Sequence, residues 1–273
     1  MIIDGRALAG EVLARAKARS GALGRAPRVL AIVANETPAT KSYLAIKAKR
    51  AVDAGCALEV RQFSGSVSAA ELQSAITTSD ADAIIVQLPL PEGIDAKVIC
   101  DSIPLTKDAD VLSDVARQKF ARADTDACVP PVVGAIAEIF HTHNVELKGK
   151  RAVIVGRGFL VGAPAAMWLA QQGVQVTAVN RSTPDFSHML RDADIIVTGA
   201  GSPHLITSDI LKQGVVLIDA GTSESNGIVV GDADPACAEV CSLFTPVPGG
   251  IGPLAVAKLF ENAVTLAERA MNT

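Results

Sequence analysis

Apolar residues recur with two different periods along the chain. Short runs rich in Val, Ile and Ala predict strands, and longer stretches with apolar residues on one face predict helices. The predicted strands are residues 28–34, 57–63, 83–87, 151–155, 174–179, 194–198, 215–219 and 242–244. The predicted helices are residues 5–23, 38–54, 69–79, 131–143, 161–172, 208–213 and 254–271. Alternating strands and helices indicate parallel sheets covered on both faces, which is an α/β fold.

The predicted strands fall into two groups, which indicates two α/β domains. Three of them precede residue 90 and the others follow residue 150. Residues 101–131 have weak periodicity and several helix breakers, as expected for a crossover between domains. A length of 273 residues is compatible with this division, because domains average roughly 150 residues.

Composition and charge exclude several classes of protein. With 49% apolar and 20% charged residues the chain is not disordered. A net charge of −4 argues against a broad electrostatic contact with nucleic acid or an anionic membrane. The two long uncharged stretches, 158–180 and 240–257, are interrupted by Pro and Gly, so we expect no membrane-spanning helix. The sequence therefore predicts a soluble protein with no nucleic-acid or membrane partner.

The five cysteines are scattered and do not form a C-x-x-C motif. They are expected to be buried free thiols in a reducing compartment, with no disulfide and no metal site. The first 20 residues carry Glu11, Arg15 and Lys17 and contain no signal-peptide apolar region. A cytoplasmic location is the prediction.

A glycine turn follows the predicted strand 151–155 and precedes a predicted helix. Gly156, Gly158 and Gly162 are spaced G-x-G-x-x-x-G, one residue longer than the common dinucleotide fingerprint. Gly156 would permit the tight turn, and Gly158 would let the backbone approach a pyrophosphate at the helix N-terminus. A glycine turn without a ligand is the alternative, but the flanking strands favour a Rossmann-type dinucleotide-binding domain.

The end of the next predicted strand bears on the choice of cofactor. An NAD site is expected to have an acidic residue about 20 positions on, but here the strand leads into Asn180, Arg181 and Ser182. Arg181, with Arg157, could hold a 2′-phosphate through charge-assisted hydrogen bonds, which favours NADP over NAD. A solvated loop arginine is the alternative.

The first predicted domain contains a candidate proton-transfer group. Tyr43 and Lys47 are four residues apart and project from one helix face. That face could be merely basic and solvated, or Lys47 could be catalytic with Tyr43 as hydrogen-bonding or stacking partner. Gln87 is the polar residue at the C-terminal end of an apolar strand, where α/β sheets bind ligands. A satisfied buried glutamine is the alternative there.

Four motifs occur in one order along the chain. They are Y-x-x-x-K at 43–47, V-Q-L-P-L-P at 86–91, K-D-x-D at 107–110 and P-V-P-G-G-I-G-P at 246–253, with the glycine turn before the last. Together they resemble the bifunctional methylenetetrahydrofolate dehydrogenase/methenyltetrahydrofolate cyclohydrolase family over nearly the whole chain. The resemblance implies oxidation of 5,10-methylenetetrahydrofolate with NADP and hydrolysis of the methenyl product to 10-formyltetrahydrofolate.

The resemblance also implies roles for individual residues. Lys47 corresponds to the catalytic lysine, Tyr43 to its paired tyrosine, Gln87 to the glutamine that tunes it and Asp110 to the acid that holds the pterin. Folate-side contacts are implied for Pro248, Gly249 and Gly250, and cofactor contacts for Gly156, Arg157, Gly158, Gly162, Asn180, Arg181 and Ser182. No metal is implied.

The same resemblance implies the domain organisation. Residues 1–141 are expected to form a folate-binding catalytic domain to which the C-terminal helix, 252–273, returns, and residues 142–251 the NADP-binding domain. A homodimer is also implied. Two departures from the family pattern lie near the expected active-site rim: Val111 replaces the usual glycine after K-D-x-D, and residues 127–131 read A-C-V-P-P where P-C-T-P is common.

Three alternatives remain open from the sequence. An enzyme with only one of the two activities would keep the same residues. A shikimate-type dehydrogenase would explain the glycine turn but not Tyr43, Lys47 and Gln87 with the proline-rich loop. A non-catalytic dinucleotide sensor would have no need of Lys47.

Overall fold

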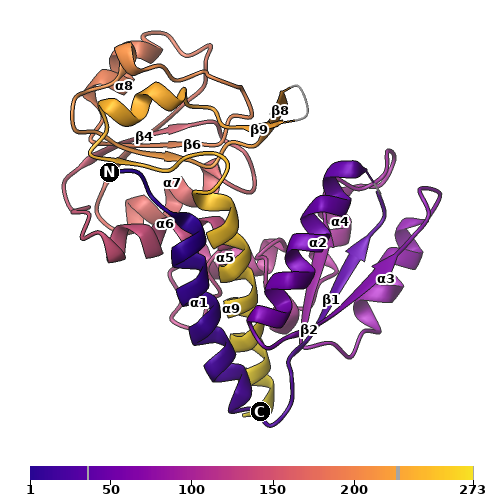
Figure 1. Ribbon diagram of the computed structural model, residues 1–273. Coiled ribbons are helices and arrows are strands. Elements are labelled where there is room, and N and C mark those ends of the chain that lie inside the picture. The colour runs from indigo at the N-terminus through magenta and orange to yellow at the C-terminus, as the bar shows by residue number, and fades with distance from the viewer. Residues whose placement is uncertain (36, 226–227, 273) are drawn as a thin grey trace. The chain divides into compact units, whose positions relative to one another are not determined.

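The computed structural model describes residues 1–35, 37–225 and 228–272. The chain divides into two compact units, each built on a parallel sheet (Figure 1). The three-stranded unit contains Gly10–Pro131 and the C-terminal segment from Val256. The five-stranded unit contains Met1–Ala9 and Val132–Ala255. The predicted α/β class with two parallel sheets is confirmed.

The three-stranded unit has the strand order β2-β1-β3, with both pairs parallel. Its strands are β1 (Arg28–Val33), β2 (Ala57–Gln62) and β3 (Ala83–Gln87). Leu30 of β1 and Ile84 of β3 pack in one core with Leu72 of α3 (Ala69–Thr77) and Ile99 of α4 (Ala96–Asp101). The unit also holds α2 (Pro38–Asp53), a 3₁₀ turn η1 (Leu105–Lys107) and α5 (Asp114–Ala121).

Two long helices, α1 (Gly5–Gly21) and α9 (Ile251–Met271), each begin in the five-stranded unit and end in the three-stranded one. Within the three-stranded unit they run side by side (Figure 1). Arg19 of α1 donates to the Glu268 carboxylate at 3.0 Å and to the Thr265 hydroxyl at 2.7 Å. Residues at the two ends of the sequence are thereby joined in one unit.

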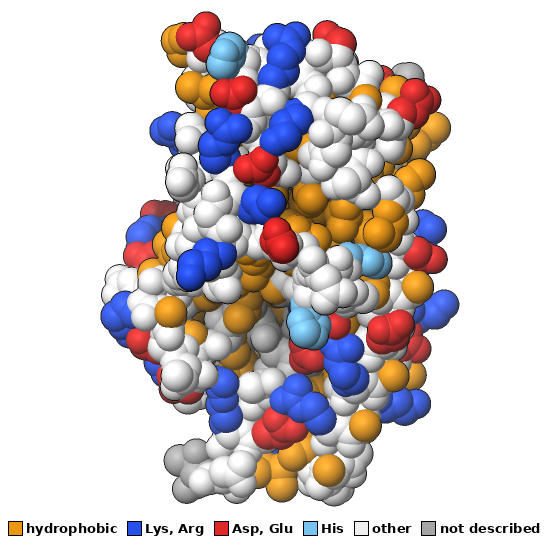
Figure 2. Space-filling model, turned by 90° about the vertical axis from the view of Figure 1, so that its left-hand side faces the viewer, with side chains coloured by type: hydrophobic (Ala, Val, Ile, Leu, Met, Phe, Trp, Pro, Cys, Tyr) orange, Lys and Arg blue, Asp and Glu red, His pale blue; other side chains and the backbone are white. Residues whose placement is uncertain are grey.

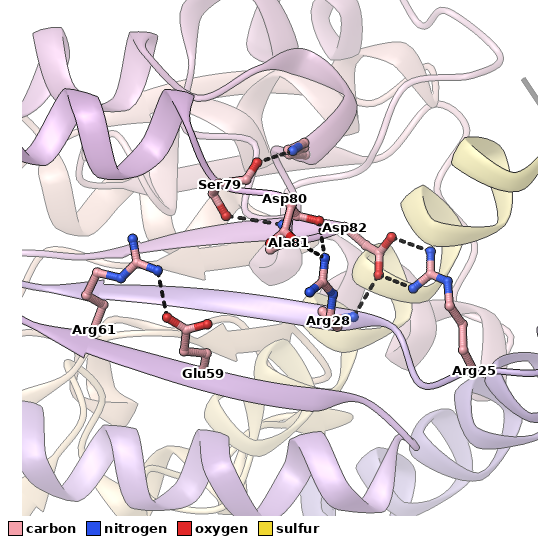
Figure 3. A network of polar contacts seen from close by, with 9 residues as sticks. Arg25, Arg28, Glu59, Arg61, Ser79, Asp80, Ala81 and Asp82 are labelled. Carbon is pink, nitrogen blue, oxygen red and sulfur yellow. Dashed lines mark hydrogen bonds and ion pairs between the residues drawn. The ribbon is translucent and has the colours of Figure 1, made fainter.

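A polar network lies at the amino ends of β1 and β3 (Figure 3). Arg25 donates two hydrogen bonds of 2.6 Å to the Asp82 carboxylate, which also accepts the Arg28 backbone N–H at 2.7 Å. Burial alone would raise the pKa of Asp82, but these donors outweigh it and lower the pKa. This network occupies the amino edge of the sheet, and its residues are therefore separate from those at the carboxyl edge.

The five-stranded unit has the strand order β10-β7-β6-β4-β5, with every pair parallel. Its strands are β4 (Arg151–Val155), β5 (Gln175–Val179), β6 (Ile195–Thr198), β7 (Val216–Asp219) and β10 (Leu243–Phe244). Helix α7 (Gly162–Gln171) covers one face and α8 (Phe186–Asp192) the other (Figure 1). Strand β5 lies on one side of β4, and β6, β7 and β10 follow in chain order on the other side. This is the arrangement of a Rossmann-type sheet.

The structure corrects several predicted elements. Residues 208–213 do not form a helix but a 3₁₀ turn, Ser208–Ile210, after which Leu211 is extended and buried in the core. Residues 101–131 are not a bare crossover, because η1 and α5 lie there within the three-stranded unit. The pattern also missed α4, α8 and the antiparallel hairpin β8 (Ser223–Ser225) and β9 (Ile228–Val230). These elements are too short for periodicity to reveal.

Surface and thiol chemistry are unremarkable in the described part of the chain. Figure 2 shows Lys and Arg side chains interspersed with Asp and Glu over the face that it draws. All five cysteines are free, and four of them are buried. Among the described residues, no helix has both the length and the apolar composition required to span a membrane.

Candidate active site

Lys47 and Gln87 meet in the three-stranded unit. Lys47 lies on α2, whose N-terminus is fixed by a capping box between Thr37 and Thr40. Gln87 is the last residue of β3, and its Oε1 accepts a hydrogen bond of 2.9 Å from Lys47 Nζ. The Gln87 amide Nε2 donates to the Leu88 carbonyl at 2.9 Å, which fixes the amide orientation. The solvated-face interpretation of Lys47 does not fit this arrangement, because Lys47 Nζ is bonded to the residue that ends a buried strand.

The surroundings of Lys47 lower the pKa of its amine. Burial lowers the pKa of Lys47, and the carboxylate of Asp110 opposes this effect. Burial likewise raises the pKa of Asp110, against the lowering effect of Lys47. A lysine whose pKa moves toward neutrality can accept and return a proton, as a general acid–base group must. The predicted trio of Lys47, Gln87 and Asp110 is thus brought together.

The loop that carries Asp110 is fixed by two residues that the sequence did not single out for this purpose. The buried Asp108 carboxylate accepts the backbone N–H groups of Leu112 and Ser113 at 3.0 and 2.8 Å. Asn262 of α9 donates from Nδ2 to the Ala109 carbonyl at 2.9 Å and to the Val129 carbonyl at 2.8 Å. Contacts between residues 133 or more positions apart leave no local signal in a sequence.

Both departures from the family pattern lie in this region. Val111 has φ +57°, a left-handed conformation that favours glycine and strains a β-branched residue. Its side chain is buried, which offsets part of that strain. In the second departure, residues 127–131, the Val129 carbonyl accepts one of the two hydrogen bonds that Asn262 donates. The Tyr43 side chain lies outside the part of the chain that the structure describes, so its predicted pairing with Lys47 stays a prediction.

The three glycines of the turn in the five-stranded unit have different structural surroundings. Gly156 leaves β4 with φ +96°, a conformation that L side chains rarely adopt. A Cβ at Gly162 would lie 2.1 Å from the Gly156 carbonyl oxygen, so the start of α7 packs directly on the turn. A Cβ at Gly158 would meet only the Gly199 oxygen at 3.9 Å. Gly158 is therefore the position with room for a ligand to approach the backbone.

The turn after β5 presents polar groups beside this glycine turn. Asn180 Oδ1 accepts the Ser182 backbone N–H at 2.9 Å, and the Asn180 N–H donates to the Thr183 hydroxyl at 2.9 Å. Arg157 reaches β5 and donates to the Ala178 carbonyl at 2.9 Å. The Arg181 side chain is exposed on the same turn. Two guanidinium groups thus lie at the strand end where a dinucleotide's adenosine ribose is bound in this fold.

The proline-rich loop after β10 is held by close backbone contacts within the five-stranded unit. Gly249 has φ +113°, and the Gly250 N–H donates to the Pro246 carbonyl at 2.7 Å. A Cβ at Gly5, the first residue of α1, would lie 1.8 Å from the Gly250 oxygen, so only glycine fits there. Pro248 is exposed at the tip. The structure thus presents Pro248–Gly250 as a rigid loop.

Comparisons with known proteins decide the family. Residues 3–110 match the family "Tetrahydrofolate dehydrogenase/cyclohydrolase, catalytic domain", and residues 128–271 match its "NAD(P)-binding domain". The chain belongs to the tetrahydrofolate dehydrogenase/cyclohydrolase family. It is 34% identical to the "Bifunctional protein FolD" of Lacticaseibacillus paracasei over 99% of this chain and 98% of that one.

Solved structures of the family have the same fold as this chain. The bifunctional FolD enzyme of Campylobacter jejuni gives a TM-score of 0.95 at 31% identity, with 99% of both chains covered. The Trypanosoma brucei family member, solved with NADP cofactor and an inhibitor, gives a TM-score of 0.95 at 31% identity over 100% of this chain and 99% of that one. The resemblance read from the four motifs is therefore confirmed at the level of family and fold.

Proposed function

We propose that this chain oxidises 5,10-methylenetetrahydrofolate with NADP⁺ and hydrolyses the resulting 5,10-methenyltetrahydrofolate to 10-formyltetrahydrofolate. The observation that carries the proposal is the partly buried hydrogen bond between Lys47 Nζ and Gln87 Oε1 in a member of this family. A sensor without turnover would have no use for a lysine whose pKa is lowered by burial. A shikimate-type dehydrogenase is excluded by the family match.

The dehydrogenase step requires positioning rather than a protein nucleophile. NADP⁺, when bound, supplies the acceptor for the hydride that leaves the methylene carbon. The glycine turn at Gly156–Gly162 is suited to the cofactor's pyrophosphate, since Gly158 leaves the backbone accessible. Arg181 and Arg157 are suited to a 2′-phosphate. Asn180 and Ser182 complete the proposed cofactor residues.

The hydrolase step requires proton transfers. Water adds to the methenyl carbon, and ring opening then moves a proton onto the departing ring nitrogen. Neutral Lys47 can take one proton from the attacking water and return it to that nitrogen, and the remaining hydroxyl proton is released to solvent as the formyl carbonyl forms. Gln87 fixes the Lys47 amine in place, and Asp110 is proposed to accept hydrogen bonds from the pterin ring. Pro248, Gly249 and Gly250 are proposed as folate contacts and Tyr43 as the partner of Lys47.

The division of labour between the parts of the chain is also a proposal. Residues 1–141 with the C-terminal helix 252–273 are proposed to bind folate, and residues 142–251 to bind NADP. A homodimer, a cytoplasmic location and the absence of nucleic-acid and membrane partners are supported by the family resemblance and the sequence composition. Light scattering of the purified protein tests the dimer.

Turnover by the purified protein tests the function. Methylenetetrahydrofolate is mixed with NADP⁺ or NAD⁺, and reduced cofactor and methenyl product are followed separately. We expect reduction of NADP⁺ in preference to NAD⁺ and subsequent loss of the methenyl product. No turnover with either cofactor would overturn the dehydrogenase assignment. Turnover with persistent methenyl product would leave a monofunctional dehydrogenase.

A further inference from the structure

Two carboxylates are buried in the five-stranded unit without an ion pair among the described residues. Asp219 ends β7 and is 1% exposed, and Asp232 follows β9 and is 0% exposed. A buried charge is costly unless hydrogen bonds satisfy it. Such groups are expected to serve a purpose that an apolar residue could not. Neither takes part in the chemistry proposed above.

Asp232 fixes the loop that follows β6 through hydrogen bonds. Its Oδ2 accepts the Thr198 hydroxyl at 2.7 Å and the Ala200 N–H at 2.6 Å, and its Oδ1 accepts the Ser202 N–H at 2.7 Å. Three donors from one short segment therefore converge on one carboxylate. The path of residues 199–202 is set by this side chain.

Asp219 performs the same task for the segments around β7. Its carboxylate accepts the Gly221 and Ala233 N–H groups at 2.9 and 2.8 Å, and the Asp232 N–H at 3.2 Å. The Asp219 backbone N–H donates to the Thr245 hydroxyl at 2.7 Å, at the start of the proline-rich loop. Burial dominates the environment of Asp219 and raises its pKa to about 6, although the backbone donors oppose this.

Glycines make room for both carboxylates. A Cβ at Gly221 would lie 2.4 Å from the Asp232 carboxyl carbon, and a Cβ at Gly231 would lie 2.1 Å from Asp219 Oδ2. Two carboxylates at the carboxyl edge of the sheet thus join the loops after β6, β7 and β9, and the backbone of Asp219 contacts the loop after β10. We call Asp219 and Asp232 the acid clamp.

The acid clamp lies beside the proposed cofactor path. The loop after β6 touches the glycine turn, because a Cβ at Gly156 would lie 3.0 Å from the Gly199 oxygen. In a Rossmann-type sheet a dinucleotide crosses from the strand-end that holds its adenosine, here β5, over the turn after β4 to the other half of the sheet. That half consists of β6, β7 and β10. The nicotinamide end is therefore directed to the loops that the clamp joins.

We propose that Asp232, supported by Asp219, is a positioning residue that shapes the backbone receiving the nicotinamide half of NADP. This inference rests on the proposed dehydrogenase function. Its consequence is selective: the clamp serves cofactor binding and hydride transfer, whereas hydrolysis relies on Lys47, Gln87 and Asp110 in the other unit. Loss of the clamp should separate the two activities.

The test is Asp232→Asn, because an amide has one acceptor oxygen and would direct its NH₂ group at a backbone donor. Asp192→Asn is the matched control, since the Asp192 carboxylate is exposed on α8. Three quantities are measured: NADP⁺ affinity by calorimetry, dehydrogenase kcat and KM, and hydrolysis of methenyltetrahydrofolate without cofactor. We expect Asp232→Asn to weaken NADP⁺ binding and dehydrogenase kcat/KM about tenfold or more, with hydrolysis within about twofold of the wild type.

The outcomes separate the clamp from the underlying function. A parallel fall of both activities in Asp232→Asn, or unchanged NADP⁺ affinity and dehydrogenase rate, would contradict the proposed positioning role of Asp232. Wild-type protein that binds NADP⁺ but has no dehydrogenase activity would refute the proposed function. The NADP⁺ affinities of the wild type and Asp232→Asn would in that case still test the positioning role of Asp232. Should Asp232→Asn fail to fold, Thr198→Val removes a single donor to Asp232 and should produce the same separation on a smaller scale.

Discussion

Replacing Gln87 by Glu places a negative charge where the structure has a neutral acceptor for Lys47. The two atoms concerned, Lys47 Nζ and Gln87 Oε1, are 2.9 Å apart. At an effective dielectric constant of about 20, a full charge at that distance stabilises the ammonium by about 6 kcal/mol. Desolvation of the new carboxylate and its repulsion by Asp110 oppose a large part of this energy. The net effect is a higher pKa of Lys47 and a smaller neutral fraction.

The assay is the pH dependence of methenyltetrahydrofolate hydrolysis, corrected for hydrolysis without enzyme. Hydrolysis should rise with pH as Lys47 loses its proton, and in Gln87→Glu this rise should move about two pH units higher. The rate near pH 7.5 should fall about 100-fold as a result. Dehydrogenase activity, which transfers no proton through Lys47, should keep its pH profile.

A matched control is available on β2. Gln62→Glu makes the same chemical change at an exposed position and should leave both pH profiles in place. If the pH profile of hydrolysis is unchanged in Gln87→Glu, or moves to lower pH, the assignment of Lys47 as the proton-transfer group held by Gln87 is refuted.

Two further variants address the remaining parts of the account. Arg181→Ala should reduce the preference for NADP⁺ over NAD⁺ by about tenfold or more in kcat/KM, because a charge-assisted contact to the 2′-phosphate is lost; an unchanged preference would exclude Arg181 from that role. Asn262→Leu leaves the Ala109 and Val129 carbonyls without their donor and should lower the free energy of unfolding by about 1–3 kcal/mol. It should also raise the KM for folate while NADP⁺ affinity, measured by calorimetry, stays constant.

The sequence predicted the sheets well because their strands are continuous buried runs. Residues 83–87 and 151–155 have the bounds of β3 and β4, since strands buried on both faces read as unbroken apolar segments. Residues 208–213 had an apolar pattern too short to distinguish a helix from a loop that buries Leu211. Helix α5, in turn, rests on its Ser113 cap, which accepts the Ala116 N–H, more than on any periodicity.

The candidate site was predictable only where motif and chemistry coincide. Lys47, Gln87 and Asp110 stand in recognisable motifs, and the structure brings them together. Asn262 donates to backbone carbonyls, and Asp232 accepts two of its three hydrogen bonds from backbone N–H groups, all far away in the sequence. Such a contact depends on the partner's main chain and not on its side chain, so it leaves no pair of residue types to find. The folded chain is needed to identify residues of this kind.

The most direct test of the account is Lys47→Met, which keeps the length and apolar stem of the side chain and removes the amine. Methenyltetrahydrofolate hydrolysis and NADP⁺ affinity are measured on the same preparation, with Lys49→Met as control because Lys49 is exposed on the same helix. We expect hydrolysis to fall by about 10²-fold or more, NADP⁺ affinity to be unchanged and the control to retain both. Hydrolysis at the wild-type rate in Lys47→Met would contradict the assignment of Lys47 as the proton-transfer group.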